Sequence, residues 1–277
     1  MTITNHIRAG ALDLYVEQYG EGPDVLLIGG LGDPIESWQH QIDGLCDRYR
    51  ITAHDNRGMG RSPLPDGPLT IPSMAADAAD VLRSLDIGSA HVVGFSGGSV
   101  IAQELALRHP GLVRSLVLMS TWARPDNYWK AMTRSWRWMV ASAPDERTFL
   151  ESFFVWVYTH RAHEDGTVAQ IVEETLAFPH KASVEAIQRT IDALAVHETA
   201  DRLHTLDTPT LVLAGGDDLI TPPVYGHQVA DLVPGARFEV LAGEAHQPFQ
   251  EVPAAFNARV DEFWCEVDSR RRSVETP

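Results

Sequence analysis

The stretch His91–Val100, HVVGFSGGSV, decides the fold, because it joins a β-branched run to three glycines that surround Ser96. Its core, Gly94-Phe95-Ser96-Gly97-Gly98, fits the pattern G-x-S-x-G of a sharp turn from a buried strand into a helix. Such a turn strains the backbone of the central serine, and side chains at Gly94 and Gly98 would collide as strand and helix close together. The stretch therefore predicts that the Ser96 hydroxyl stands clear of the sheet edge. A glycine-rich turn whose serine only caps the helix is the alternative.

Short aliphatic runs recur along the chain without alternation of polar and apolar residues, which is typical of strands covered on both faces. These runs are Val25–Ile28, Ile51–Ala53, Val92–Val93, Leu116–Met119 and Leu211–Ala214. Leu12–Tyr19 does alternate and predicts an antiparallel edge strand, and Arg237–Leu241 predicts a last strand. Helical patterns separate the runs at Ser37–Arg48, Ser73–Leu85, Ser99–Arg108, Val224–Leu232 and Pro253–Trp264. This order predicts an α/β fold with a mostly parallel sheet flanked by helices.

Residues 122–200 break this rhythm, because they show helical periodicity and no convincing buried strand. We expect a helical cap, or lid, inserted between two strands, which divides the chain into a core of residues 1–121 and 201–277 and a cap of residues 122–200. Five of the seven tryptophans lie in the cap, and we expect most of its aromatic residues to hold the cap helices together and a minority to line a pocket. The tail after Cys265 is expected to be frayed and solvated.

Composition narrows the classes of function. The 277 residues carry a formal net charge of −16, which disfavours nucleic acid and anionic membrane surfaces as partners. The first residues lack the apolar segment of a signal peptide, and no apolar run approaches the length of a membrane span. Only two cysteines occur, without a paired motif, so neither a disulfide framework nor a zinc site is expected. These features predict a soluble cytoplasmic protein, and they leave a homodimer open.

A serine is a poor nucleophile unless a base, held in place by an acid, activates it. The stretch LVLAGGDDLITPP ends a predicted strand in Asp217 and Asp218, and EVLAGEAHQPF ends the next strand in His246. Both loops follow the carboxyl ends of strands, at the same sheet edge as Ser96, and the chain order Ser, Asp, His occurs in one of the convergent triads. The histidines of the cap region are expected to be surface or packing residues: His160, His163, His180, His197 and His204.

With these motifs the chain resembles the α/β-hydrolase fold superfamily over nearly its whole length. The resemblance rests on LLIGGLGDPIESW (residues 26–38), HDNRGMGRS (residues 54–62), the GFSGG turn and the two later loops. Within the superfamily the chain is most similar to capped carboxylic-ester hydrolases such as enol-lactonases and polyketide methyl esterases. The resemblance implies a twisted sheet of about eight strands, with Ser96 as nucleophile, His246 as general base and then acid, and Asp218 as orienting acid. It implies that Asp217 faces solvent or caps the turn.

The resemblance also implies an oxyanion hole formed by the backbone amides of Leu31 and Gly97. Residues expected to contact the substrate are Gly30, Phe95, Trp122 and Trp129. Arg57 is expected to brace neighbouring loops and Asp55 to pair locally. No metal and no organic cofactor is expected.

These residues predict a serine hydrolase that cleaves a carboxylic ester or lactone of a small, largely apolar molecule through an acyl-enzyme on Ser96. A carbon–carbon bond hydrolase and a cofactor-free haloperoxidase-type enzyme would use the same residues. A non-hydrolytic cyclase or a ligand-binding protein could keep the fold and use only the pocket. Lys130, Arg134 and Arg137 could receive a substrate carboxylate or lie on the solvent face of a cap helix.

Overall fold

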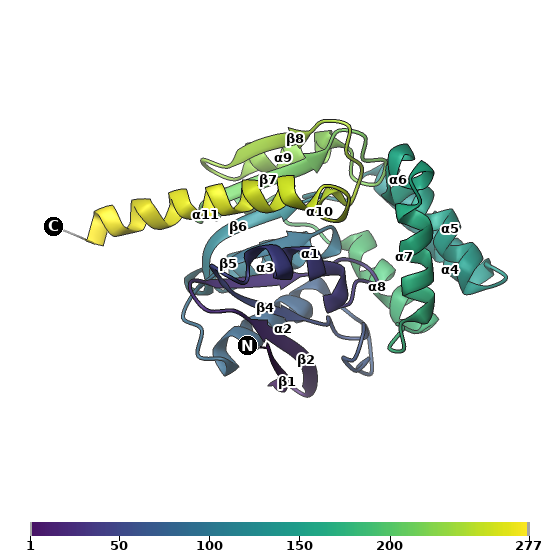
Figure 1. The fold of residues 1–277 in the computed structure, drawn as a ribbon, viewed down its shortest axis with the longest axis horizontal. Helices are drawn as coiled ribbons and strands as arrows, with labels where there is room; N and C mark the ends of the chain where they lie inside the picture. The colour runs from purple at the N-terminus through teal and green to yellow at the C-terminus, as the bar shows by residue number, and fades with distance from the viewer. Residues whose placement is uncertain (1, 276–277) are drawn as a thin grey trace.

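The described part of the chain, residues 2–275 of a computed structural model, forms one sheet in the order β1-β2-β4-β3-β5-β6-β7-β8 (Figure 1). Strands β1/β2 and β2/β4 pair antiparallel and all other neighbours pair parallel, which confirms a mostly parallel sheet of eight strands. The strands are β1 (Thr2–Ala9), β2 (Leu12–Tyr19), β3 (Asp24–Ile28), β4 (Arg50–His54), β5 (Ala90–Phe95), β6 (Val113–Met119), β7 (Thr210–Gly215) and β8 (Arg237–Leu241).

Strand β2 has the predicted bounds, but it is not the edge of the sheet. Strand β1 pairs along its whole outer side, from Thr2 opposite Tyr19 to Ala9 opposite Leu12. The prediction of an edge strand was wrong because the sequence of β1, TITNHIRA, is too polar to stand out as an apolar run.

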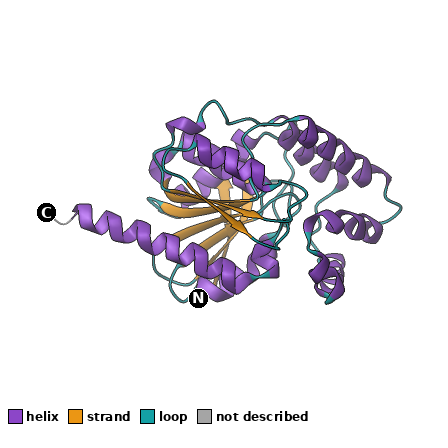
Figure 2. Cartoon of the chain, turned by 90° about the horizontal axis from the view of Figure 1, so that it is seen from above, coloured by secondary structure: helices purple, strands orange, loops and turns teal. Residues whose placement is uncertain are grey.

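Helices cover both faces of the sheet, as expected (Figure 2). Successive side chains of a strand point to opposite faces, so Val25 and Leu27 pack into one hydrophobic core while Leu26 and Ile28 pack into the other. The helices of the body are α1 (Gln39–Leu45), α2 (Ile71–Ser84), α3 (Gly97–Arg108), α9 (Pro223–Leu232), α10 (Pro248–Glu251) and α11 (Pro253–Glu275). Double-sided burial explains why the central strands read as unbroken apolar runs.

Between β6 and β7 the described chain runs through five helices and no strand, and Figure 1 shows these helices grouped at one end of the molecule. They are α4 (Asn127–Ser142), α5 (Glu146–Val157), α6 (His160–Glu164), α7 (Thr167–Ala177) and α8 (Val184–Val196). The ring of Trp129 lies 4.0 Å from that of Trp122 and 5.6 Å from that of Trp136, so aromatic rings pack against one another within this group. The division into a core and a separate cap stays a prediction.

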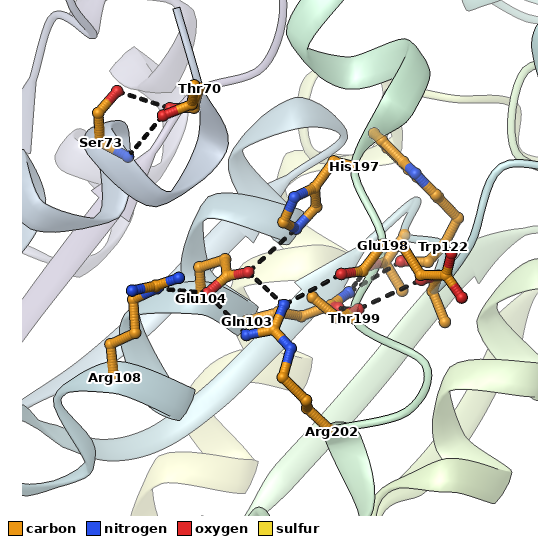
Figure 3. Close-up of polar contacts among 12 residues, drawn as sticks. Thr70, Ser73, Gln103, Glu104, Arg108, Trp122, His197, Glu198, Thr199 and Arg202 are labelled. Atoms are coloured by element: carbon orange, nitrogen blue, oxygen red, sulfur yellow. Dashed lines mark hydrogen bonds and ion pairs between the residues drawn. The ribbon is translucent and has the colours of Figure 1, made fainter.

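Both ends of this helical insertion are attached to α3 (Figure 3). The Gln103 amide donates to Thr121 Oγ1 over 2.7 Å and to the Trp122 carbonyl over 3.0 Å, and it accepts a hydrogen bond from Thr199. The neighbouring carboxylate of Glu104, which is 1% exposed, accepts hydrogen bonds from Arg108 and Arg202. The helix that follows Ser96 therefore holds the insertion at its entry and at its exit.

Helix α11 continues past Cys265, so the prediction of a frayed tail was wrong (Figure 1). Val267 is buried in the core beneath the sheet, and Glu266 pairs with Arg237 over 3.2 Å, so the helix stays attached to the body beyond Cys265. Neither α11 nor another helix among residues 2–275 is long and apolar enough to cross a membrane.

Candidate active site

Ser96 lies at the turn between β5 and α3, in a strained backbone conformation with φ +50° and ψ −118°. Its backbone N–H donates to the Met119 carbonyl over 2.9 Å, and its own carbonyl accepts from Ser99 Oγ over 2.6 Å. A methyl group on Gly94 would overlap the Gly98 backbone, and one on Gly98 would overlap the Ile28 carbonyl. The two glycines are thus required by the close approach of strand and helix, as expected from the sequence.

Three residues that are far apart in the chain meet at the carboxyl ends of β5, β7 and β8. Nε2 of His246 lies 3.0 Å from Oγ of Ser96, and Nδ1 of the same ring lies 2.8 Å from Oδ2 of Asp218. All three side chains are buried, and Ser96 is 8% exposed. The structure therefore brings together the serine, histidine and aspartate that the sequence analysis singled out, in a continuous chain of hydrogen bonds.

The carboxylate of Asp218 is held in one orientation by its own loop. Oδ1 accepts from the backbone N–H groups of Ile220 and Thr221 over 2.8 and 2.9 Å, and Oδ2 accepts from Thr221 Oγ1 over 2.9 Å. Asp217 is exposed, which agrees with the choice of Asp218. Thr221 was not predicted, although a threonine three residues after an aspartate in a turn is a recognisable local signal.

The backbone of His246 is fixed by two contacts from other segments. Its carbonyl accepts from Ser120 Oγ over 2.8 Å, and its N–H donates to the Val157 carbonyl at the end of α5 over 3.0 Å. The ring of Phe95 lies 5.0 Å from the imidazole and packs from there into the core beneath the sheet edge. Ser120 gave no sequence signal, because it is a lone serine after a strand and acts across 126 residues.

The backbone amides of Leu31 and Gly97 face the same small region. Gly97 is the first residue of α3, and a methyl group on it would lie 3.6 Å from Leu31 N. Within the described residues neither amide has a hydrogen-bond acceptor. Unpaired backbone donors beside a helix N-terminus form a site that favours negative charge.

Asp33 is a second carboxyl group close to Ser96, and the sequence analysis did not predict it. Its Oδ2 accepts from Gly30 N over 2.9 Å, and its Oδ1 accepts from Ser37 Oγ over 3.2 Å. Burial raises the pKa of Asp33 to about 6, although these hydrogen bonds and the nearby His246 favour its charged form. No lysine or arginine among residues 2–275 forms an ion pair with Asp33.

A small cavity lies beside the Leu31 and Gly97 amides. It has a volume of about 10 Å³ and is lined by Gly30, Leu31, Gly97 and Leu194, together with residues of the loop after β4 and of helices α2, α3 and α8. A hollow of about 810 Å³ lies elsewhere, near the amino ends of β6, β7 and β8, and is lined by none of the predicted site residues.

The remaining predicted site residues are distributed as follows. Trp122 and Trp129 are buried against each other, and neither lines the small cavity, so their contact with substrate stays a prediction. Lys130, Arg134 and Arg137 are exposed, and Arg137 pairs with Asp192 over 2.8 Å, so these cations lie on the solvent face.

Asp55 pairs locally with Arg61, as expected, whereas Arg57 ties its loop to helix α2 and not to a neighbouring loop. Arg57 binds Asp77 on α2 through two hydrogen bonds of 2.6 Å, and Asp55 accepts from the backbone N–H groups of Ile35 and Arg61 over 2.8 Å. Within residues 2–275 no group of histidine, cysteine, aspartate or glutamate side chains is arranged to hold a metal ion.

Comparisons with known proteins identify the family to which the chain is similar. A family model described as alpha/beta hydrolase fold matches residues 23–251. A protein of Azorhizobium caulinodans named "Putative carbamate hydrolase RutD" is 31% identical over 264 residues, covering 95% of this chain and 99% of the relative. A protein of Mycobacterium tuberculosis named "Putative non-heme bromoperoxidase BpoC" is 32% identical and covers 92% of this chain and 99% of its own.

Solved structures show the same fold. The crystal structure of that bromoperoxidase-named protein superimposes with a TM-score of 0.85 over 95% of this chain and 99% of the other. A thermophilic esterase from Thermogutta terrifontis is 26% identical, with a TM-score of 0.84 over 96% of this chain and 99% of the esterase.

Proposed function

The chain belongs to the alpha/beta hydrolase fold family, and from this premise we propose that it is a serine hydrolase that cleaves a carboxylic ester or lactone of a small molecule. The observation that carries the proposal is the continuous hydrogen-bonded chain from Asp218 through His246 to Ser96. A buried carboxylate that accepts from Nδ1–H leaves Nε2 free to receive the proton of the serine hydroxyl.

In the proposed reaction, Ser96 Oγ attacks the substrate carbonyl while His246 Nε2 takes its proton. The Leu31 and Gly97 amides donate to the oxyanion that forms, and each such donor is worth about 3 kcal/mol in comparable sites. The tetrahedral intermediate collapses to an acyl-enzyme as His246 gives the proton to the leaving alkoxide. Water, deprotonated by His246, then attacks the acyl-enzyme, and the acid leaves as Ser96 regains its proton.

The charges around the site support an uncharged substrate. Asp33 is a carboxyl group beside Ser96 without a cationic partner among the described residues, and the cations of α4 point outward. A substrate carboxylate near Asp33 would meet repulsion, and Arg57, a cation that lines the adjacent small cavity, is already paired with Asp77. Neutral esters and lactones are therefore better candidates than lactones that carry a free carboxylate.

Two related reactions have specific support from named relatives. A carbamate presents the same kind of carbonyl to Ser96, and one relative is named for carbamate hydrolysis. In a perhydrolase, hydrogen peroxide replaces water in the second step and yields a peracid, and another relative is named as a bromoperoxidase. Carbon–carbon bond hydrolysis, cyclisation and simple ligand binding remain the further alternatives, and product analysis by mass spectrometry separates all of them.

The test compares the natural enzyme with Ser96→Ala on p-nitrophenyl acetate, methyl esters, lactones and carbamates. We expect the natural enzyme to turn over at least one of these substrates and Ser96→Ala to turn over none. The thermal unfolding of Ser96→Ala should match that of the natural enzyme. In peptide mapping of the natural enzyme, a fluorophosphonate probe should label Ser96. Ser84→Ala, at an exposed serine of α2, is the matched control and should keep both activity and labelling. Undiminished turnover by Ser96→Ala would end the proposal.

A further inference from the structure

Helix α8 covers the two amides proposed to bind the oxyanion. A methyl group on Gly97 would meet the two terminal methyl groups of Leu194 at 3.3 and 3.4 Å. Leu194 is 2% exposed, so its side chain is buried. The volume that a side chain at position 97 would occupy is thus filled from the other side, by a residue of the insertion.

The same helix also covers the loop that carries the other amide. The Ile187 side chain would lie 3.7 Å from a methyl group on Gly32, next to Leu31. The cavity left between Leu194, Gly97 and Leu31, about 10 Å³, is at the lower limit for a single water molecule. Little space therefore remains between α8 and the two amides.

Leu194 is held in place by its neighbours. The indole N–H of Trp129 donates to the Leu194 carbonyl over 3.1 Å, and the ring of Trp129 packs on Trp122. The carbonyl of Trp122 is in turn bound by Gln103 of α3, the helix that begins at Gly97. Leu194 and Gly97 are therefore connected through one short series of contacts, so their spacing is set by the fold.

We propose that Leu194 determines the size of the acyl group that the enzyme accepts, and that it restricts the site to small, unbranched acyl groups such as acetyl. This inference rests on the proposed serine hydrolase function. In this proposal the two residues have complementary roles. Gly97 has no side chain, and the side chain of Leu194 from α8 occupies the volume that a side chain at position 97 would fill.

The first experiment measures kcat/KM for p-nitrophenyl acetate and p-nitrophenyl 2-methylpropanoate with the natural enzyme and with Leu194→Ala. We expect the ratio of kcat/KM for the branched ester to kcat/KM for the acetyl ester to rise at least about tenfold in Leu194→Ala, as for other enlarged apolar pockets. Ile191→Ala is the matched control, because Ile191 is a buried residue of the same helix that does not line the cavity. The control should leave the ratio unchanged. Leu194→Val, a smaller change, should raise the ratio less and keeps the test informative if Leu194→Ala folds poorly.

The second experiment tests the contact itself. The backbone of Gly97 lies outside the positive-φ region, so alanine fits there except for its approach to Leu194. We expect Gly97→Ala to lower kcat/KM for the acetyl ester, and the double variant Gly97→Ala with Leu194→Ala to recover most of that loss.

The outcomes separate this inference from the proposed function. Ser96-dependent turnover with an unchanged substrate ratio in folded Leu194→Ala and Leu194→Val, or no recovery in the double variant, overturns the role of Leu194 alone. Absence of Ser96-dependent turnover on every ester overturns the proposed function and the inference with it.

Discussion

The hydroxyl of Ser120 donates a hydrogen bond of 2.8 Å to the backbone carbonyl of His246. It joins the end of β6 to the loop after β8, and it acts on the backbone of His246 and not on its ring. Ser120 is therefore placed to set the height of the imidazole above Ser96. Its own backbone has φ +54°, a conformation that glycine adopts without strain.

Ser120→Gly should lower kcat for ester hydrolysis about five- to tenfold with little change in KM, because one positioning hydrogen bond worth about 1 kcal/mol is lost. Steady-state kinetics on p-nitrophenyl acetate measure kcat and KM separately. Ser115→Gly is the control, because it removes a hydroxyl of β6, the strand that ends just before Ser120, and this hydroxyl bonds His91 and not His246. A rise in KM with unchanged kcat in Ser120→Gly would contradict the positioning role.

Asp33 should make stability depend on pH in a defined direction. Burial raises its pKa from 3.8 to about 6, so the folded protein binds this proton more tightly than the unfolded chain does. The contribution of Asp33 to stability is therefore most favourable at low pH and declines as pH rises from about 4 to 6.

Asp33→Asn removes this titration and should keep the bond to Gly30, since its amide oxygen can accept from the same N–H. We expect the Tm of Asp33→Asn relative to the natural protein to increase as pH is raised from 4 to 7 in scanning calorimetry. A Tm difference that is the same at both ends of this range would show that Asp33 does not titrate there.

Glu104 should be important for stability and not for chemistry. Burial opposes its ionisation, but hydrogen bonds from Arg202 and Arg108 outweigh this and lower the pKa of Glu104 (Figure 3). This stabilising contribution is present above the ordinary glutamate pKa and is lost as pH falls through the lowered value.

Glu104→Gln should lower the free energy of unfolding by about 1–3 kcal/mol at pH 7, because the two guanidinium groups lose a charged acceptor. Denaturant titration measures this loss. Glu185→Gln, at an exposed glutamate that pairs with Arg189, should change stability by less than about 0.5 kcal/mol. Equal effects of the two substitutions would contradict the importance of the buried network.

The part of the site that the sequence predicts is the part that follows from local rules. Ser96 is marked by glycines that the strand-to-helix turn requires, and Asp218 and His246 each follow a strand that ends at the same sheet edge. These residues need only the order of strands and helices to be placed near one another, so reading the chain in sequence is enough to propose them.

The features that were missed depend on contacts between distant segments. Strand β1 is stabilised by pairing with β2 and not by an apolar pattern of its own, and the end of α11 stays attached to the body through Glu266 and Val267. Ser120 and Leu194 resemble many other serines and leucines until the structure brings them against His246 and Gly97. No local pattern distinguishes such residues beforehand.

The chain leaves the body after β6 and re-enters it before β7 at nearly the same point, where the backbone N–H of Thr199 donates to the Ala123 carbonyl over 2.8 Å. The intervening segment has both of its chain ends at this junction, and it also packs on the body elsewhere, for example through the Val157 carbonyl and Leu194. A segment of different length could therefore be joined at these two residues without altering how the strands connect, provided that it again supplied a hydrogen-bond acceptor for the N–H of His246.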